Sequence, residues 1–302
     1  MTLNIGIQID AKINFAKDST FLLMQEAQRR GYKLFYYNSD KLFLLDNLPY
    51  ALMKSVTTDA GSFCFGDEER CKLDEMDIIL MRQNPPFDVR YLTTTYILEK
   101  CKRAKVLNDP AGVRNTPEKL SVHFTLPTLV SEDLDLIEAF HNEHKETILK
   151  PLYAFGGQNV SYIKGDGSNV KVIASIIKDT YNCPIMAQKF NAGVMKGDKR
   201  VMILGGKILG VFSRIPQNGD FRSNLCLGNK YTTSVLSDEE KLMCSEIAAK
   251  LLEDGIVFAG LDLIDSHLIE VNVTSPTGLL ELNHLYGVES EKECWDYFES
   301  IL

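Results

Sequence analysis

The sequence predicts a mixed chain, with an open α/β layer over residues 1–117 and α+β units after it. Before residue 117, short apolar strands alternate with amphipathic helices, the order of elements that builds a largely parallel sheet. Beyond residue 199, the glycine pair Gly205-Gly206 separates two apolar segments, which is typical of an antiparallel hairpin. The chain has 302 residues, 45% of them hydrophobic and 25% charged, so it is long enough for about two globular domains.

The first part of the chain alternates strands with helices. Residues 3–10 alternate apolar and polar side chains, as in a half-buried strand. Asp18-Ser19 can cap the amphipathic helix that follows, and Gly31 can end it. A helical pattern covers about 88–104, and further strands are predicted at 33–37, 77–81 and 106–107.

Thr116-Pro117 marks a predicted domain junction. Thr116 suits a helix N-cap and Pro117 the first helical position, so we expect a new helix there. The next unit contains the glycine pair Gly156-Gly157. Its expected helices are 132–145 and 170–181, and its expected strands are 147–152, 159–163 and 185–190.

The last third of the chain is rich in strands. Residues 200–214 predict a hairpin that turns at Gly205-Gly206. The polar stretch 216–231 is long for a loop in a compact chain, which indicates a functional or mobile segment. Ser237 and Glu240 form a capping box for a helix that ends at Gly255, and two strands follow at 256–264 and 267–274.

Composition narrows the classes of function. The chain has 33 basic and 41 acidic residues, a net charge of -8, and no block of five or six like charges. We therefore expect no nucleic-acid and no membrane partner. The N-terminus does not resemble a signal peptide and no apolar run reaches about 18 residues, so a cytoplasmic location is expected. The seven cysteines, an odd number, indicate reduced thiols rather than a disulfide framework.

The common nucleotide and nucleophile motifs are absent. The sequence has neither the glycine-rich phosphate loop that ends in Gly-Lys-Ser/Thr nor a G-x-G-x-x-G segment after a strand. It also has no G-x-S-x-G motif, which lowers the expectation of a covalent intermediate on the protein. A nucleotide would have to be held in another way.

The hairpin over 260–276 carries a candidate metal site. Glu270 and Asn272 are two residues apart on a strand, so they share a face, and Leu268 is expected on the same face. If the turn is centred on Ser266, Asp262 lies directly opposite Glu270. Such oxygen ligands suit Mg²⁺; the alternative is a strand whose polar side chains face water.

Several basic residues are candidates for binding anions. Lys150 ends an apolar strand just before the glycine pair, and Lys119 follows Pro117, so both could reach a phosphate. Arg82 precedes Pro85-Pro86, a stiff turn that fixes its direction. Three further arginines lie in turns or at strand ends: Arg200, Arg214 and Arg222. The alternative for each is an ordinary surface position, whereas together they favour an anion site.

At these positions the chain closely resembles the prokaryotic glutathione synthetases, a family of the ATP-grasp superfamily. The matching segments lie in family order along nearly the whole chain: LMRQNPPFD, LND-P, R-N-T-P-E-K-L, ILKPL…GG, GDKRV, SRIPQNGDFRSNL and GLDLI…LIEVNVTSPTG. The resemblance implies an N-terminal open α/β (pre-ATP-grasp) domain followed by a two-lobed ATP-grasp fold. It further implies ATP-dependent ligation of γ-glutamylcysteine with glycine, through an acyl phosphate, to give glutathione, ADP and phosphate.

The resemblance also assigns domains. Residues 1–117 would be the substrate-binding domain, 118–190 the central (lid) subdomain, and 191–302 the C-terminal subdomain with the metal site and a mobile loop over 216–231. ATP would lie between the two lobes. Mg²⁺, or Mn²⁺ in its place, would be the metal, and the family implies a homo-oligomer.

The motifs assign individual residues to four roles. ATP would be bound by Lys119, Lys150, Gly156, Gly157 and Gln188. The metal would be held by Asp262, Glu270 and Asn272, and the catalytic arginines would be Arg200, Arg214 and Arg222. The substrates would contact Arg82, Asn224, Ser275, Pro276 and Thr277.

Two alternatives remain open at this point. Another ATP-grasp ligase that joins a different carboxylate and amine would keep the lysines and the metal residues, but its arginine pattern would differ. A catalytically idle nucleotide-binding protein would have no need of Asp262, Glu270, Asn272 and the two lysines.

Overall fold

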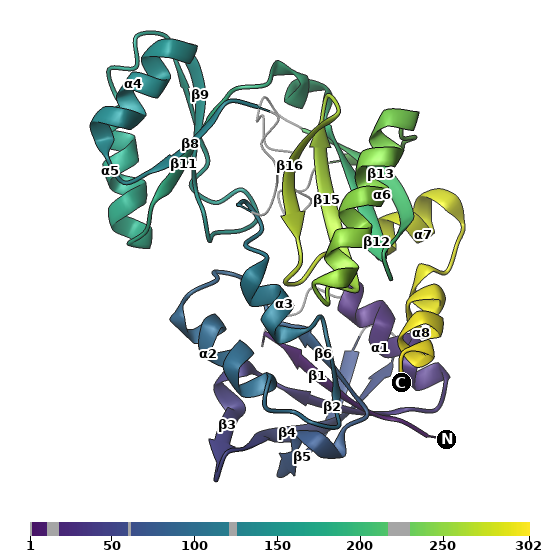
Figure 1. The fold of residues 1–302 in the computed structure, drawn as a ribbon. Coiled ribbons are helices and arrows are strands. Elements are labelled where there is room, and N and C mark those ends of the chain that lie inside the picture. The colour runs from purple at the N-terminus through teal and green to yellow at the C-terminus, as the bar shows by residue number, and fades with distance from the viewer. Residues whose placement is uncertain (1, 11–17, 60–61, 121–125, 217–229) are drawn as a thin grey trace.

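The computed structural model describes residues 2–10, 18–59, 62–120, 126–216 and 230–302. Within these ranges the chain forms three sheets (Figure 1). The N-terminal layer and the C-terminal sheet lie against each other, and a smaller lobe projects to one side. None of the helices in the described ranges has both the length and the apolar character needed to cross a membrane.

The N-terminal sheet has the strand order β3-β4-β2-β1-β6-β7, with β5 paired to β4. Strands β2, β1, β6 and β7 run parallel, as the alternation of strands and helices predicted. The strands are β1 (Asn4–Ile9), β2 (Lys33–Tyr37), β3 (Leu42–Leu45), β4 (Leu48–Asp59), β5 (Ser62–Lys72), β6 (Ile78–Arg82) and β7 (Lys105–Leu107). The helices are α1 (Ser19–Arg29), α2 (Val89–Leu98) and α3 (Pro110–Asn115), with 3₁₀ turns at Ser39–Lys41 and Leu73–Glu75.

Two features of this layer differ from the prediction. Thr116 caps the C-terminus of α3 and does not begin a helix, and residues 118–120 form a turn closed by Leu120 N–H donating to Pro117 O at 2.9 Å. Residues 42–72, for which no element was predicted, form antiparallel strands at the edge of the sheet. The turn at Asp46-Asn47 has positive φ at both residues, which Asp and Asn tolerate better than most residues.

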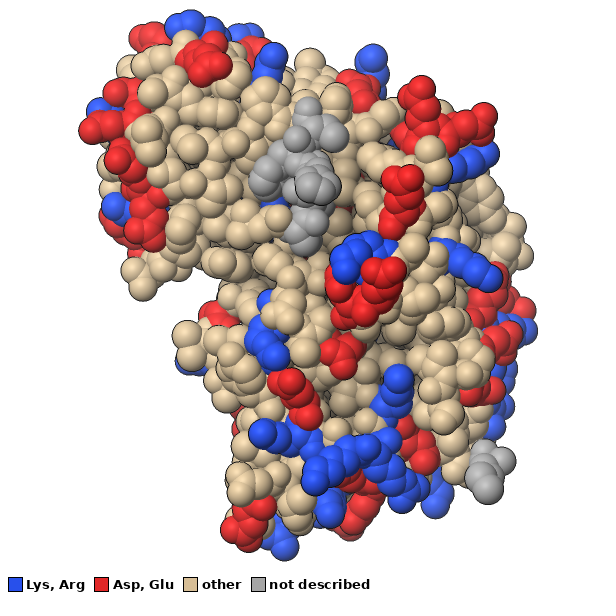
Figure 2. Space-filling view, in the orientation of Figure 1, with Lys and Arg blue, Asp and Glu red and all other residues tan. Residues whose placement is uncertain are grey.

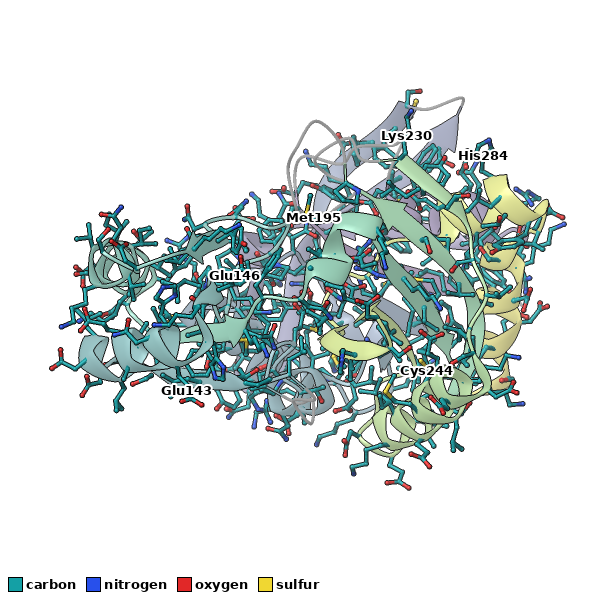
Figure 3. All side chains as sticks on the ribbon, turned by 90° about the horizontal axis from the view of Figure 1, so that it is seen from above. Glu143, Glu146, Met195, Lys230, Cys244 and His284 are labelled. Carbon is teal, nitrogen blue, oxygen red and sulfur yellow. The ribbon has the colours of Figure 1, made fainter. Side chains whose placement is uncertain are left out.

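The projecting lobe is an antiparallel sheet in the order β10-β9-β11-β8, covered on its outer face by two helices. Its elements are β8 (Thr128–Ser131), α4 (Leu134–His144), β9 (Glu146–Pro151), β10 (Ser161–Lys164), α5 (Val170–Tyr181) and β11 (Ile185–Lys189). Seen from above, Glu143 and Glu146 of the lobe lie on one side and Lys230, the first residue of β14, on the other, with the turn that carries Met195 between them (Figure 3).

The C-terminal sheet has the order β14-β13-β12-β15-β16. It is formed by β12 (Asp198–Leu204), β13 (Lys207–Ile215), β14 (Lys230–Thr233), β15 (Phe258–Ile264) and β16 (His267–Asn272), after a 3₁₀ turn at Ala192–Lys196. The helices are α6 (Asp238–Glu253), α7 (Leu279–Tyr286) and α8 (Ser290–Ser300). The predicted capping box of α6 is confirmed, because Ser237 Oγ accepts from Glu240 N–H and Glu240 Oε2 accepts from Ser237 N–H.

The hydrophobic core joins two of the three sheets. Two buried clusters each combine N-terminal residues, such as Ile79 or Ile7, with C-terminal residues, such as Val201 or Phe212. A third cluster, which includes Leu149 and Ile177, draws its buried residues from the lobe. In the space-filling view the molecule is hollowed between the lobe and the N-terminal layer (Figure 2).

Candidate active site

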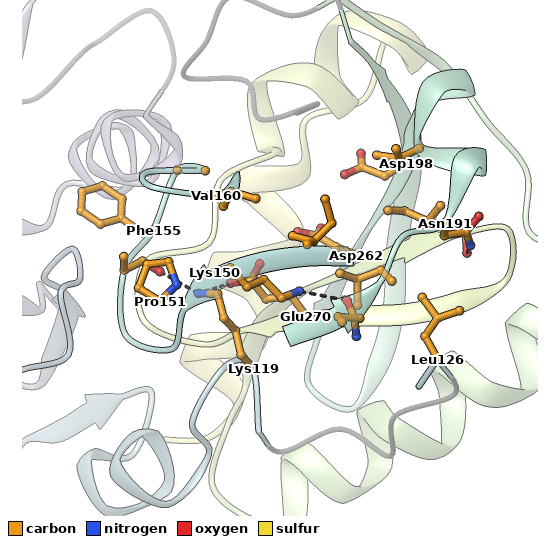
Figure 4. Close-up of a pocket in the computed structure, with 18 of the residues that line it drawn as sticks. Lys119, Leu126, Lys150, Pro151, Phe155, Val160, Asn191, Asp198, Asp262 and Glu270 are labelled. Atoms are coloured by element: carbon orange, nitrogen blue, oxygen red, sulfur yellow. Dashed lines mark hydrogen bonds and ion pairs between the residues drawn. The ribbon is translucent and has the colours of Figure 1, made fainter. Parts of the chain in front are cut away.

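A cleft of about 1000 Å³, open solvent included, lies between the lobe sheet and the C-terminal sheet (Figure 4). Its lining combines apolar side chains, such as Ile148 and Phe190, with ionisable ones, such as Lys150 and Asp262. The cleft brings together most of the predicted nucleotide and metal residues: Lys119, Lys150, Gly156, Gly157, Gln188, Asp262, Glu270 and Asn272. An apolar pocket with a few charged groups is typical of a site for a small molecule or cofactor.

The β15–β16 hairpin places the predicted oxygen ligands on the cleft. Asp262 pairs directly with Glu270, as predicted. The turn holds only Asp265 and Ser266, both at positive φ, so continuous pairing would place Asp262 opposite residue 269 instead. A β-bulge shifts the register by one residue and restores the pair.

The bulge overturns one expectation about this hairpin. Leu268 does not share the face of Glu270, because it is 5% exposed and packs in the core cluster with Val271. Ile269, the extra residue of the bulge, lines the cleft beside Glu270. Strict alternation along a strand cannot reveal such a change of face.

Asp262 is held by two arginines. Its Oδ1 accepts from Arg200 Nε at 2.5 Å, and its Oδ2 accepts from Arg200 Nη2 at 2.9 Å. The same Oδ2 lies 3.0 Å from Arg214 Nη2 and accepts from Asn272 Nδ2 at 3.1 Å. Burial alone would raise the pKa of Asp262, but the two arginine charges outweigh it and lower the pKa to about 2.

Asp198 is a site residue that sequence reasoning missed. It stands opposite Arg214 in the β12–β13 pairing and accepts from Arg214 Nε at 2.7 Å and from Nη2 at 2.6 Å. Burial lowers the pKa of Arg214, but Asp198 and Asp262 outweigh this effect and raise it above its ordinary value. The signal available in the sequence was the acidic residue two positions before Arg200, in the GDKRV segment.

Lys119 lies in the turn after α3 and reaches into the cleft (Figure 4). Its Nζ lies 3.2 Å from Glu270 Oε1 and donates to Ala154 O at 2.7 Å. This lysine therefore connects the carboxylate of the hairpin with the loop that carries Gly156-Gly157.

Lys150 lies at the end of β9 and is 7% exposed. Its Nζ donates to Gln188 Oε1 at 3.1 Å, and Gln188 Nε2 donates to Thr128 Oγ1 at 2.9 Å. Burial lowers the pKa of Lys150 to about 8, and the charge of Glu270 only partly opposes that shift.

Glu118 is a second residue that sequence reasoning missed. Its Oε1 accepts from Val273 N–H at 2.9 Å, from Thr274 N–H at 3.1 Å and from Thr274 Oγ1 at 2.8 Å. Burial, followed by the charge of Glu270, raises the pKa of Glu118. The residue is adjacent to Lys119 in the chain, but no pattern in the sequence distinguishes it from an exposed acid.

A second hollow adjoins the cleft beside the hairpin. It is lined by Ser275, Pro276 and Thr277 together with Arg200 and Arg214. Arg200 Nη1 donates to Thr277 O at 3.0 Å, so the arginine also fixes this segment. The predicted substrate segment and two of the three predicted catalytic arginines therefore meet at one place.

Arg82 lies apart from the lining of both hollows. It is 4% exposed, donates from Nη2 to Pro276 O at 2.8 Å and donates from Nε to Thr20 Oγ1 at 3.0 Å. Its guanidinium lies 5.6 Å from the centroid of the Phe258 ring. Arg82 thus reaches the predicted substrate segment through the backbone of Pro276.

Arg222, Asn224 and most of the predicted loop 216–231 lie outside the described residues.

Comparison with known proteins gives the family. The model of the prokaryotic glutathione synthetase N-terminal domain matches residues 3–114, and that of the same family's ATP-grasp domain matches residues 118–287. Proteins named glutathione synthetase from Anaplasma centrale and Rhodopseudomonas palustris are 40% and 39% identical to this chain, over 99% of it and 98% and 99% of their own lengths.

Solved structures share the fold at low identity. The D-cycloserine synthetase DcsG superimposes with a TM-score of 0.68 at 13% identity, over 95% of this chain and 96% of that one. The ATP-grasp ligase PsnB gives a TM-score of 0.64 at 15% identity, over 100% and 99%. The fold is thus an N-terminal α/β domain followed by an ATP-grasp domain, and the full-length match shows that the chain belongs to the prokaryotic glutathione synthetase family.

Proposed function

We propose that this chain joins γ-glutamylcysteine to glycine at the cost of ATP, giving glutathione, ADP and phosphate. The observation that carries the proposal is the cleft itself, where Lys119 and Lys150 lie beside the Asp262–Glu270 pair. Full-length similarity to proteins named glutathione synthetase supports this choice of substrates.

The nucleotide would lie between the two sheets. Its base would pack against apolar side chains of the cleft, and its phosphates would meet the ammonium groups of Lys119 and Lys150. Gly156 and Gly157 have φ of 63° and 73°, so the loop can bring backbone close to a phosphate where a side chain would interfere. Gln188 would keep Lys150 directed into the cleft.

The residues present suit Mg²⁺, or Mn²⁺ in its place. Asp262, Glu270 and Asn272 supply carboxylate and amide oxygens, the ligands that hard cations prefer. In the described part of the chain no three His, Cys, Asp or Glu side chains cluster as a metal site on their own, so phosphate oxygens would have to complete the coordination. When bound, the cation would offset negative charge on the phosphates.

The chemistry would need no nucleophile from the protein. A carboxylate oxygen of γ-glutamylcysteine attacks the γ-phosphorus of ATP, and the bond from phosphorus to ADP breaks, which leaves an acyl phosphate. The amine of glycine then attacks the acyl carbon, loses a proton to solvent and displaces phosphate through a tetrahedral intermediate. The protein's part is to hold the reactants together and to offset developing negative charge.

The arginines would act on the carboxylate side of the reaction. Arg200 and Arg214 line the hollow with Ser275, Pro276 and Thr277, so their charges would face the carboxylate and the transferring phosphoryl group. Arg222 and Asn224 would join them from the loop over 216–231, which would exclude water from the acyl phosphate. Arg82 would support the substrate segment through Pro276.

We further propose a cytoplasmic location, a homo-oligomeric state and the domain division given above. The odd number of cysteines supports a reducing compartment, and the family resemblance supports oligomerisation and the boundaries near 117 and 190. Light scattering of the purified protein measures the oligomeric state directly.

The test is ADP release by the purified protein with ATP and Mg²⁺, with each of the two other substrates omitted in turn. Release that needs both γ-glutamylcysteine and glycine, with a product of glutathione mass, supports the proposal. Release with some other pair of acid and amine would keep the ATP-dependent ligase and reject these substrates. Nucleotide binding without turnover of any ligase substrate would reject the enzyme.

A further inference from the structure

Asp198 lies at the start of β12 and faces the cleft at 8% exposure (Figure 4). Its two oxygens accept hydrogen bonds from Nε and Nη2 of Arg214, the residue opposite it on β13. A two-point bond between a carboxylate and a guanidinium fixes the plane of the arginine as well as its position.

The same arginine is shared with a second carboxylate. Arg214 Nη2 lies 2.6 Å from Asp198 Oδ2 and 3.0 Å from Asp262 Oδ2. Arg200 donates hydrogen bonds to both carboxylate oxygens of Asp262. Asp262, the proposed cation ligand, is therefore already in contact with two positive charges, and one of them is held mainly by Asp198.

The charges of these four residues balance, with two carboxylates and two guanidinium groups. Without the charge of Asp198, Arg214 would keep Asp262 as its remaining ion-pair partner within the described ranges, and it would add an uncompensated positive charge beside that carboxylate. Because the four side chains are buried, water would screen this charge poorly. A divalent cation at Asp262 would then bind more weakly.

We infer that Asp198 is a positioning residue: it holds Arg214 and offsets its charge, and so leaves Asp262 able to take up a divalent cation together with the nucleotide. The inference rests on the cation site proposed above. It gives Asp198 a role beyond that of a buried ion pair joining β12 to β13, since a purely structural pair would change stability without changing cation binding.

The test separates cation binding from turnover. Calorimetric titration gives the Kd of ADP for the full-length protein with saturating Mn²⁺ and, separately, with EDTA. The ratio of the EDTA value to the Mn²⁺ value measures how strongly the cation and ADP support each other's binding. Asp198→Asn is expected to lower this ratio about tenfold without weakening ADP binding in EDTA. Asp198→Glu, which keeps the charge, should remain within about threefold of the wild type.

Further variants distinguish charge from structure. Arg214→Gln should raise the ratio, because it removes the arginine that pairs with Asp198 in the described part of the chain. The double variant D198N/R214Q should return the ratio to near the wild-type value. Glu26→Gln is the matched control. Glu26 is also a buried carboxylate bonded to arginines, but it does not line the cleft, so this variant should lower Tm and leave the ratio unchanged.

The outcomes separate this inference from the proposed function. A wild-type ratio of one would overturn the cation site, and the inference with it. A large wild-type ratio that Asp198→Asn leaves unchanged would overturn the inference alone. If Asp198→Asn does not fold, Arg214→Gln and the double variant still decide, because equal ratios in these two proteins would contradict a role based on charge.

Discussion

Burial determines what the ionisable side chains of the cleft can do. Lys150 and Asp262 are both almost fully buried, and both pKa values fall, but the fall makes Lys150 easier to neutralise and keeps Asp262 charged. Lys150 loses part of its tendency to be charged, and its pKa falls to about 8. Asp262 stays ionised with a pKa of about 2, because the two arginines outweigh its burial. Of these two residues, Asp262 is thus a fixed negative charge, and Lys150 can lose its proton near pH 8.

The pKa of Lys150 predicts how ATP use depends on pH. Burial is the main cause of the low pKa, with Lys119 also lowering it and Glu270 and Asp262 raising it. Below about pH 8 the lysine is protonated and attracts the phosphates, whereas above it the lysine is neutral. We therefore expect kcat/KM for ATP to fall as the pH rises through about 8, by up to about tenfold per pH unit.

The control for this prediction is Lys150→Arg. An arginine keeps its charge to a pKa above about 12, so this variant should lose the inflection near pH 8 even if its overall rate is lower. An unchanged inflection in Lys150→Arg would assign it to another group. Initial rates at subsaturating ATP across pH 6.5–9.5, about three units around the pKa of Lys150, measure both profiles.

Glu270 is the second residue whose charge can be tested alone. Its Oε1 lies 3.2 Å from Lys119 Nζ, and its side chain faces the cleft. Glu270→Gln keeps the size of the side chain and removes the charge, so we expect turnover to fall by at least about 10²-fold while the fold remains intact.

Two measurements check this expectation: ADP release and the midpoint of thermal unfolding. Glu253→Gln is the control, because Glu253 is an exposed acid in an ion pair with Lys250 at 3.5 Å. Near-normal turnover in Glu270→Gln would contradict the assignment of Glu270 to the metal site.

At the scale of elements, the site depends on how β15 and β16 are held. Asn108 follows β7 and is 5% exposed. Its Nδ2 donates to Phe258 O and Val273 O at 2.8 Å each, and its Oδ1 accepts from Val257 N–H at 2.9 Å and from Phe258 N–H at 2.8 Å. One amide therefore ties the N-terminal layer to both strands of the hairpin.

Asn108→Ala is expected to lower the free energy of unfolding by about 3–5 kcal/mol, because it leaves four buried backbone groups without partners. Unfolding in urea measures the change. Asn142→Ala, at an exposed position of α4, should stay within about 0.5 kcal/mol of the wild type. A loss below about 1 kcal/mol for Asn108→Ala would mean that water replaces the amide.

The sequence predicted those elements whose residues repeat with a regular period. The parallel strands, the capping box at Ser237 and the pairing of Asp262 with Glu270 are confirmed. The face of Leu268 was wrong because a bulge changes the alternation, and a bulge leaves no mark in the pattern of apolar residues. Asp198 and Glu118 were missed because their partners come from a neighbouring strand and a distant segment, which only the fold brings close.

At the scale of the whole molecule, the hydrophobic core groups the three sheets into two units. The N-terminal and C-terminal sheets share two buried clusters, one containing Ile79 with Val201 and the other Ile7 with Phe212. Helix α8 also connects the C-terminal part of the chain to the N-terminal layer, because Trp295 Nε1 donates to Leu23 O in α1 at 2.7 Å. The cluster of the lobe is separate from both. The cleft therefore lies between a large unit, made of two sheets, and a small one.

This division predicts two steps in unfolding. The small lobe buries less of its surface than the large unit, so it should unfold at lower urea concentration. Trp295 is the single tryptophan of the chain and is fully buried in the large unit, so its fluorescence should report only the later step. Far-UV circular dichroism, which detects all helices and strands, should show both steps.

A tryptophan placed in the lobe and the addition of ADP test the two-step unfolding more directly. Phe140→Trp, in a Trp295→Phe background, places the only tryptophan in the lobe, where Phe140 packs against the core cluster, so its fluorescence should follow the first step. ADP bound between the two sheets would stabilise the lobe against the large unit and shift that first midpoint upward, by RT ln(1 + [ADP]/Kd) in free energy. Coincident transitions of the two tryptophans without ADP would contradict the separate core, because the lobe and the two-sheet unit would then unfold as one cooperative body.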